Sequence, residues 1–177
     1  EAVLWQGRIV EAEILAREVA RTETAMRPQA LIALSRIFFE QGRMNDALRT
    51  ADGAIQVTDS RCLPSNSLQR SRATEAAARA LIGLNRWDDA AELFRQLEVN
   101  LTTDREAWDR RFARSWERGL ILLKTGRAKE ALTVLTAAFE DAAKRTEVTS
   151  YDAQELKAFI GLAHDGLGQY AEALAVL

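Results

Sequence analysis

Residues that interrupt helices are scarce in this sequence. Only two prolines and nine glycines occur among 177 residues, while Ala, Leu, Glu and Arg dominate. These four side chains lose little rotamer freedom in a helix, whereas proline breaks a helix and glycine weakens one. No stretch of convincing length alternates apolar and polar residues with the period of a strand. The sequence therefore predicts an all-α protein without a sheet.

The sequence also contains only one cysteine and carries almost no net charge. The single cysteine, Cys62, excludes an internal disulfide framework and is compatible with a reducing compartment, so we expect a cytoplasmic location. The 24 basic and 26 acidic side chains nearly cancel, so no global field attracts nucleic acid or an anionic membrane. No apolar run approaches the ~20 residues that cross a bilayer, and the first residues do not resemble a signal peptide. We therefore expect neither nucleic acid nor membranes as partners.

One seven-residue phrase occurs five times, at residues 6–12, 41–47, 84–90, 125–131 and 167–173. Each copy has a Gly, or Asn85 in the third, followed four residues later by an acid and then by an Ala. Gly and Asn can adopt the left-handed conformation that ends a helix. The acid suits the positive end of the next helix dipole, and the small Ala permits close helix packing. Each phrase therefore predicts the corner of a helical hairpin.

These corners, together with the apolar spacing between them, predict the helices. We expect helices over residues 8–21, 28–41, 44–57, 67–84, 87–98, 104–125, 128–145, 150–167 and 170–177. Irregular segments are expected at 58–66 and 100–103, where Thr103 is a candidate N-cap. The expected inner faces carry small and apolar side chains, namely Ala12, Ala16, Val19, Ala20, Leu31, Leu34, Phe38, Ala47, Ala51, Ala54, Ile55, Ala90, Phe94, Leu97, Ala131, Leu135, Ala138 and Phe139.

The Gly and Asn positions of the five phrases are 35, 43, 41 and 42 residues apart, so helix pairs of nearly constant size repeat. The second pair shows the clearest pattern, with Leu31, Leu34, Ser35, Phe38, Gly42, Ala47, Ala51 and Ala54. This pattern resembles the tetratricopeptide repeat (TPR), in the longer variety of the kinesin light chain type. The resemblance implies a right-handed superhelix of antiparallel helix pairs, a TPR-like solenoid, whose first helices line a concave groove that holds peptides.

We interpret residues 1–177 as one array and as a piece of a longer one. The expected repeats are about 1–22 (partial), 28–57, 67–98, 103–146 and 150–177 (partial). The resemblance projects these first-helix residues into the groove: Ile32, Arg36, Phe39, Arg72, Glu75, Arg79, Ile82, Trp116, Leu120, Leu123, Phe159 and Leu162.

Two interpretations of these groove residues stay open. Arg36 and Arg79 fall at equivalent positions, so their guanidinium groups could bind a carboxylate of a partner. Alternatively, they pair with local acids such as Glu40 and Glu75. Trp116 and Phe159 could receive apolar side chains, or the aromatic stripe that contains Trp116 could fill the core against the preceding helix pair.

Catalysis, metal binding and a cofactor have little support in the sequence. His164 is the only histidine, and the repeat register predicts that it packs between helices. Cys62 is interpreted as an incidental thiol. Residues 104–118 hold five arginines and four acids, Glu117 among them, which indicates a nearly neutral solvated helix and no nucleic-acid site.

The sequence therefore favours a non-enzymatic module without catalytic, metal or cofactor residues. We expect it to bind a peptide or helix of a protein partner, or another domain of its own parent chain. Two alternatives stay open. The array is either a regulatory or sensor arm of a larger enzyme, such as a peptidase, or a self-assembly module that associates through uncapped ends.

Overall fold

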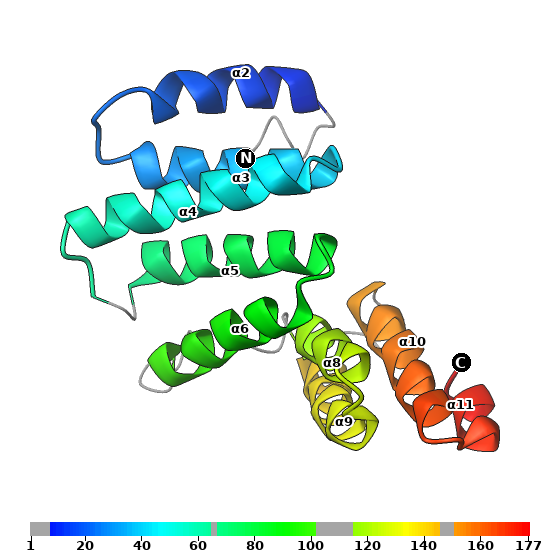
Figure 1. Cartoon of the computed structure of the whole chain (residues 1–177). Coiled ribbons are helices and arrows are strands. Elements are labelled where there is room, and N and C mark those ends of the chain that lie inside the picture. Colours follow the sequence, from blue (N-terminus) through cyan, green and yellow to red (C-terminus); the bar gives the residue numbers. More distant parts are fainter. Residues whose placement is uncertain (1–7, 65–66, 102–114, 146–150) are drawn as a thin grey trace. The chain divides into compact units, whose positions relative to one another are not determined.

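The computed structural model describes residues 8–64, 67–101, 115–145 and 151–177. These residues form helices and their connections and contain no strand, which confirms the expected all-α class. Figure 1 shows the helices α2 (Ile9–Ala20), α3 (Arg27–Glu40), α4 (Met44–Ser60), α5 (Leu68–Gly83), α6 (Trp87–Leu101), α8 (Ser115–Lys124), α9 (Ala128–Arg145), α10 (Tyr151–Gly166) and α11 (Tyr170–Val176). The expected N-cap Thr103 lies outside the described residues, as do residues 104–114 of the expected long helix and residue 150, the expected start of the helix over 150–167.

The chain divides into two compact parts, the N-terminal lobe Glu1–Asn100 and the C-terminal lobe Leu101–Leu177. In the N-terminal lobe, α2 packs on α3, α3 on α4 and α4 on α5 (Figure 1). In the C-terminal lobe, α8 packs on α9, α9 on α10 and α10 on α11. We refer to α3–α4 as repeat 2, α5–α6 as repeat 3, α8–α9 as repeat 4 and α10–α11 as repeat 5; α2 is the second helix of repeat 1. First helices also contact each other, α3 with α5 and α8 with α10, as in a solenoid of stacked pairs.

The corners adopt the backbone that the repeated phrase predicts. Gly42, Gly126 and Gly168 have φ angles of +73°, +76° and +73°, and Asn85 has +58°. At the first of these corners, the N–H of Gly42 donates to the carbonyl of Phe39 (2.9 Å) and that of Arg43 to the carbonyl of Phe38 (2.8 Å). The same pair of hydrogen bonds recurs at the other three corners. This pattern closes a helix by satisfying its last carbonyls, so the predicted corners are confirmed where they are described.

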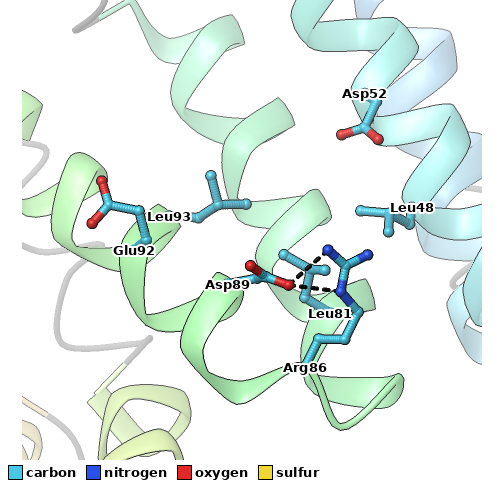
Figure 2. Close-up of a pocket in the computed structure, with 7 residues that line it drawn as sticks. All are labelled: Leu48, Asp52, Leu81, Arg86, Asp89, Glu92 and Leu93. Atoms are coloured by element: carbon cyan, nitrogen blue, oxygen red, sulfur yellow. Dashed lines mark hydrogen bonds and ion pairs between the residues drawn. The ribbon is translucent and has the colours of Figure 1, made fainter.

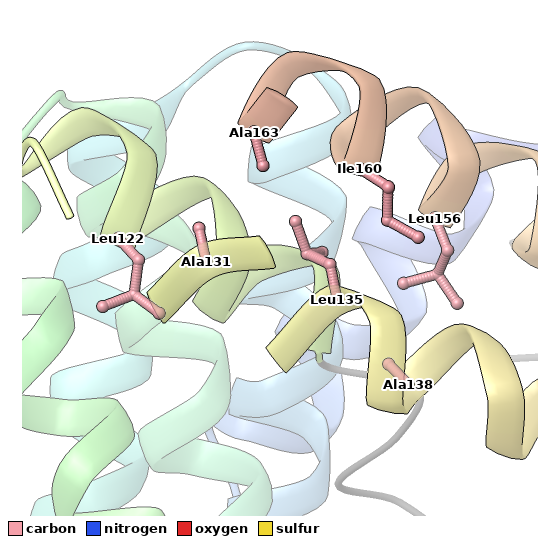
Figure 3. Packing of buried hydrophobic residues seen from close by; sticks show 7 residues of the cluster. All are labelled: Leu122, Ala131, Leu135, Ala138, Leu156, Ile160 and Ala163. Atoms are coloured by element: carbon pink, nitrogen blue, oxygen red, sulfur yellow. The ribbon is translucent and has the colours of Figure 1, made fainter. Parts of the chain in front are cut away.

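The alanine that ends each phrase brings the next helix close to its neighbour. Ala47, Ala90 and Ala131 each have 0% exposed surface. The hydroxyl of Ser35 on α3 donates to the carbonyl of Ala47 (2.8 Å), which ties the two helices of repeat 2 together. The core of the C-terminal lobe, drawn in Figure 3, surrounds such an alanine with apolar side chains of α8, α9 and α10. It comprises Leu122, Ala131, Leu135, Ala138, Leu156, Ile160 and Ala163.

Three sequence expectations about the helices are wrong. Helix α4 continues to Ser60, past the expected end at Val57, because Thr58 is fully buried and its hydroxyl donates to the Ile55 carbonyl (2.7 Å). Helix α6 continues to Leu101, because no Gly or Pro interrupts residues 98–101. Val19 is 38% exposed, whereas Ala16 and Ala20 of the same helix do pack against the core cluster of the N-terminal lobe.

Candidate functional site

The predicted groove residues of α3 share one side of that helix. Ile32, Arg36 and Phe39 follow helical spacing and are half-buried, while Leu34 and Phe38 on the other side are buried. Phe39 also packs against the core cluster of Leu34, Phe38, Ala47 and Ala80. This side of α3 therefore combines a supported aromatic ring with the partly accessible Arg36 side chain.

The predicted residues of α5 differ in how accessible they are. Arg72 is exposed, whereas Arg79 and Ile82 are half-buried. Arg79 Nη2 lies 3.2 Å from Oε1 of Glu75, one turn earlier on the same helix. Of the two interpretations of Arg79, the structure therefore shows the local pairing with an acid.

The C-terminal lobe brings two predicted aromatic residues together. The rings of Trp116 on α8 and Phe159 on α10 are stacked, with centroids 5.6 Å apart and planes 14° from parallel. Both rings are half-buried against the core cluster of this lobe. The two helices that carry them, α8 and α10, are the first helices of successive repeats. Trp116 thus stacks on the following repeat, and packing of its aromatic stripe against the preceding pair stays a prediction. Trp108 and Phe112 lie outside the described residues.

Three predicted leucines lie on the same two helices. Leu120 and Leu123 of α8 are half-buried, and Leu123 packs against the core cluster. Leu162, one turn after Phe159 on α10, is 53% exposed. The first helices of repeats 4 and 5 thus carry two stacked rings, two half-buried leucines and one exposed leucine.

Sequence reasoning missed a set of ion pairs at the corners. Arg43, Arg86 and Arg127 follow the turn residue and bind the acid three positions later, with N–O distances of 2.7, 2.6 and 2.5 Å. Arg8 and Glu11 form the same pair in the first phrase. The signal was available, because Arg occupies this position in four of the five phrases. The Arg43 hydrogen bond lowers the pKa of Asp46, and the Arg127 hydrogen bond lowers the pKa of Glu130.

A second missed feature is a cluster of charges that links α2 to the first described corner. Glu13 accepts a hydrogen bond from Gln41 Nε2 (2.9 Å) and one from Arg17 Nη2 (2.7 Å). The guanidinium carbons of Arg17 and Arg43 lie 5.3 and 4.2 Å from the centroid of the Phe38 ring. The hydrogen bonds from Gln41 and Arg17 lower the pKa of Glu13. Two cations thus share one aromatic ring and one carboxylate.

Two expectations about ionisable groups need correction. Glu117 on α8 is fully buried, so the segment counted as a solvated helix places at least this carboxylate in the interior. His164 is half-buried rather than packed between helices, because it lies in the last turn of α10, where its Nδ1 lies 2.8 Å from Oε1 of Gln169. Cys62 is exposed and lies in the other lobe.

The described residues contain no group of three or more His, Cys, Asp or Glu side chains arranged to hold a metal ion. In the same part of the chain, no helix combines the length and the apolar composition needed to cross a membrane.

Helix pairs, left-handed corners and stacked first helices define the class of helical repeat proteins. A family model described as the tetratricopeptide repeat matches residues 71–96, which include the corner at Asn85. A comparison with curated protein sequences gives no significant match.

Solved structures of similar fold cover nearly the whole chain. A protein of Podosopora anserina described as a kinesin light chain, with nearly identical TPR-like repeats, matches 99% of this chain and 86% of its own, with a TM-score of 0.75 and 21% identity. BtubC (BKLC) from P. vanneervenii matches 99% of this chain and 72% of its own, with a TM-score of 0.78 and 14% identity. MamA of MSR-1 matches 99% of this chain and 86% of its own, with a TM-score of 0.66 and 14% identity. This chain therefore has the fold of a TPR-like solenoid, as the resemblance of its repeats implies.

Proposed function

We propose that this chain is a protein-binding module that holds a peptide or helix of a partner against the first helices of its repeats. The observation that carries the proposal is the stacked pair of Trp116 and Phe159, which joins the first helices of repeats 4 and 5. Aromatic side chains that are held by a core and remain partly accessible are typical anchors of protein interfaces. The solenoid fold supports the proposal, because a preorganised surface loses little entropy on binding.

The partner chemistry that suits the C-terminal lobe is an apolar side chain. Trp116, Phe159 and Leu162 supply an apolar surface, and Leu162 is already exposed to receive contacts. In the N-terminal lobe, Arg36 and Arg72 are the proposed polar contacts, with Ile32, Phe39 and Ile82 as apolar neighbours. Arg79 is a weaker candidate for a partner contact, because it already forms an ion pair with Glu75.

A matched pair of leucine substitutions tests the proposal. Peptides that bind the whole chain are selected from a random displayed library, and the dissociation constant of one selected peptide is measured for each variant. Leu162→Ala and Trp116→Ala are expected to weaken binding, by about fivefold or more, because they remove apolar contact area. Leu174→Ala removes an equally large side chain that is 77% exposed on the second helix α11, so its binding should not change.

The same assay with Arg36→Ala combined with Arg79→Ala tests the polar half of the surface. The proposal is wrong if Leu162→Ala and Trp116→Ala bind every selected peptide as tightly as the unchanged chain, at unchanged thermal stability.

Self-association is a second candidate function, and exposed apolar side chains at both ends of the described chain favour it. Val10 and Ile14 of α2 are 70% and 60% exposed, and Leu174 of α11 is 77% exposed. Repeat arrays bury such faces against a further repeat or another copy. Light scattering at several concentrations distinguishes the candidates, since Leu174→Ala would lower the apparent mass only if α11 forms the contact.

A further inference from the structure

An open pocket of about 260 Å³ lies between the second helices of repeats 2 and 3, and most of its charged lining residues are exposed (Figure 2). Leu48 and Asp52, one turn apart, line it from α4. Asp89 and Leu93, also one turn apart, line it from α6, and Leu81 of α5 lies between the two helices. The remaining lining residues are Arg86 and Glu92. Leucines and carboxylates therefore alternate along both sides of the pocket.

The acidic side chains of this pocket differ in their partners. Asp89 is bound by Arg86, whose Nη2 lies 2.6 Å from Oδ2, and Glu92 is bound by Arg95 at 2.7 Å. Asp52 makes no hydrogen bond or ion pair with any described residue. Burial raises the pKa of the Asp52 carboxyl, and the charge of Arg86 opposes this effect. The pocket thus holds three carboxylates, of which two are bound by arginines and the third, the exposed Asp52, lacks a direct partner.

The preceding pair of second helices, α2 and α4, has the same arrangement with different residues. Counted from the turn phrases, the counterparts of Leu48, Asp52, Leu81, Asp89 and Leu93 are Glu13, Arg17, Phe38, Asp46 and Thr50. Arg17 therefore stands where Asp52 stands in the pocket. Its guanidinium carbon lies 5.3 Å from the centroid of Phe38, and its Nη2 lies 2.7 Å from Glu13. In that earlier copy, an arginine of the chain itself lies over the ring of Phe38, the counterpart of Leu81 in the pocket.

From this internal comparison we propose that the pocket between α4 and α6 binds an arginine side chain of a partner peptide. The guanidinium lies between Asp52 and Asp89, and the aliphatic part of the arginine packs against Leu48 and Leu93. The charge is complementary, because Asp89 and Glu92 are each bound by one arginine of the chain, which leaves the carboxylate of Asp52 as the excess negative charge. A guanidinium is weakly hydrated and its stem is apolar, so leucine walls suit it better than they suit an ammonium ion. This site lies on second helices and does not depend on the proposed groove.

A short peptide serves as the probe. Acetyl-Gly-Ser-Arg-Ser-Gly-amide is titrated into the whole isotope-labelled chain, and the backbone amide signals are followed by NMR. The control peptide carries citrulline, which has the shape of arginine without its charge. Saturable shifts are expected at Leu48, Asp52 and Leu93, with affinity about tenfold higher for the arginine peptide, since hydrogen bonds between charged groups are the stronger ones.

Three variants complete the experiment. Asp52→Asn is expected to weaken the binding of the arginine peptide about tenfold, because it removes one carboxylate partner. Asp88→Asn removes an exposed acid of α6 that does not line the pocket, and it should leave the affinity unchanged. The double variant Leu48→Glu with Asp52→Arg copies the residues of the earlier repeat and should abolish binding, because an arginine of the chain then stands in place of Asp52.

The inference is overturned if the arginine peptide gives no saturable shifts at these amides, or if the citrulline peptide binds as well. It is also overturned if Asp52→Asn has no effect, or if Asp88→Asn weakens binding as much as Asp52→Asn. The amide spectrum of each variant shows directly that its fold is kept.

Discussion

The corners within the repeats and the corner that follows α4 make the same backbone turn with different residues. After α4, the N–H of Cys62 donates to the carbonyl of Asp59 (2.9 Å) and that of Leu63 to the carbonyl of Thr58 (3.1 Å). This is the hydrogen-bond pattern of the corner at Gly42, and the φ angle of Cys62 is +52°. A residue with a side chain pays a steric cost of about 1–2 kcal/mol in this conformation, which glycine avoids.

What differs is how the chain leaves the two kinds of corner. Each described corner within a repeat leads at once into the next helix, and the alanines of the first three are completely buried. The corner after α4 leads to residues 63–67 before α5 begins, and Arg61 holds it by donating to the carbonyls of Thr24 and Ala25 (2.7 and 3.3 Å). The turn geometry is therefore general, whereas the repeated phrase adds close helix packing. The predictions below separate these two contributions.

The largest effect is expected from filling the close contact that follows a corner. Ala131→Leu should lower the free energy of unfolding by about 1–3 kcal/mol, because a larger side chain must displace the packed core around it. Ala173→Leu makes the same change at the last corner, where the alanine is half-buried, and should cost less. Urea unfolding followed by circular dichroism measures both. Equal losses in the two variants would show that the buried contact is not what the phrase contributes.

A smaller effect is expected from the backbone of a corner alone. Gly126→Ala should lower the free energy of unfolding by about 1–2 kcal/mol, because φ is +76° at this position. The added methyl group meets no atom within 4 Å, so the backbone conformation alone accounts for this loss. Gly53 lies inside α4 and also has open space around it, so Gly53→Ala is a matched control of opposite sign. It should stabilise the protein by about 0.5–1 kcal/mol through helix propensity. The same unfolding assay applies, and a gain in stability for Gly126→Ala would contradict the left-handed corner.

At the corner after α4, a substitution to glycine should stabilise the protein, whereas the substitution of Gly126 by alanine should destabilise it. Cys62→Gly is expected to raise the free energy of unfolding by about 0.5–1 kcal/mol, since relief of the left-handed strain exceeds the extra freedom of glycine in the unfolded chain. Cys62→Ala removes the thiol and keeps the strain, so it should change stability little. If the alanine variant were as stable as the glycine variant, the thiol rather than the backbone would be the source of the gain.

The comparison of corners also explains what the sequence could predict. The four described corners with Gly or Asn were predicted because these residues are typical of the left-handed conformation. The corner at Cys62 was missed, and with it the last turn of α4, because a cysteine carries no such signal. The buried alanines followed from the phrase, whereas the exposure of Val19 depends on which neighbours cover α2.

Less of the candidate site than of the fold could be predicted from the sequence. The resemblance to the repeat family placed Trp116 and Phe159 on first helices, but their stacking depends on how successive repeats pack. The pairing of Arg79 with Glu75 was one of two open interpretations, because spacing alone does not decide between a neighbour and a ligand. The corner arginines were visible in the phrase. They were overlooked because the acid was assigned to the helix dipole, which accounts for its charge without an arginine.

The smallest effect concerns these corner arginines, and it is best measured as a pKa. Arg127 holds the pKa of Glu130 below its ordinary value of 4.5, chiefly through its hydrogen bonds, so Arg127→Gln should raise that pKa. Asp46, held by Arg43 in the other lobe, serves as an internal control whose pKa should stay lowered. Because the folded pKa is depressed, the pair stabilises the protein above pH 4.5, and this contribution is lost as the pH falls through the folded pKa. Both groups are solvent-exposed, so salt should weaken the effect in NMR titrations. An unchanged Glu130 pKa in Arg127→Gln would mean that the helix terminus, and not the arginine, sets the charge of the corner.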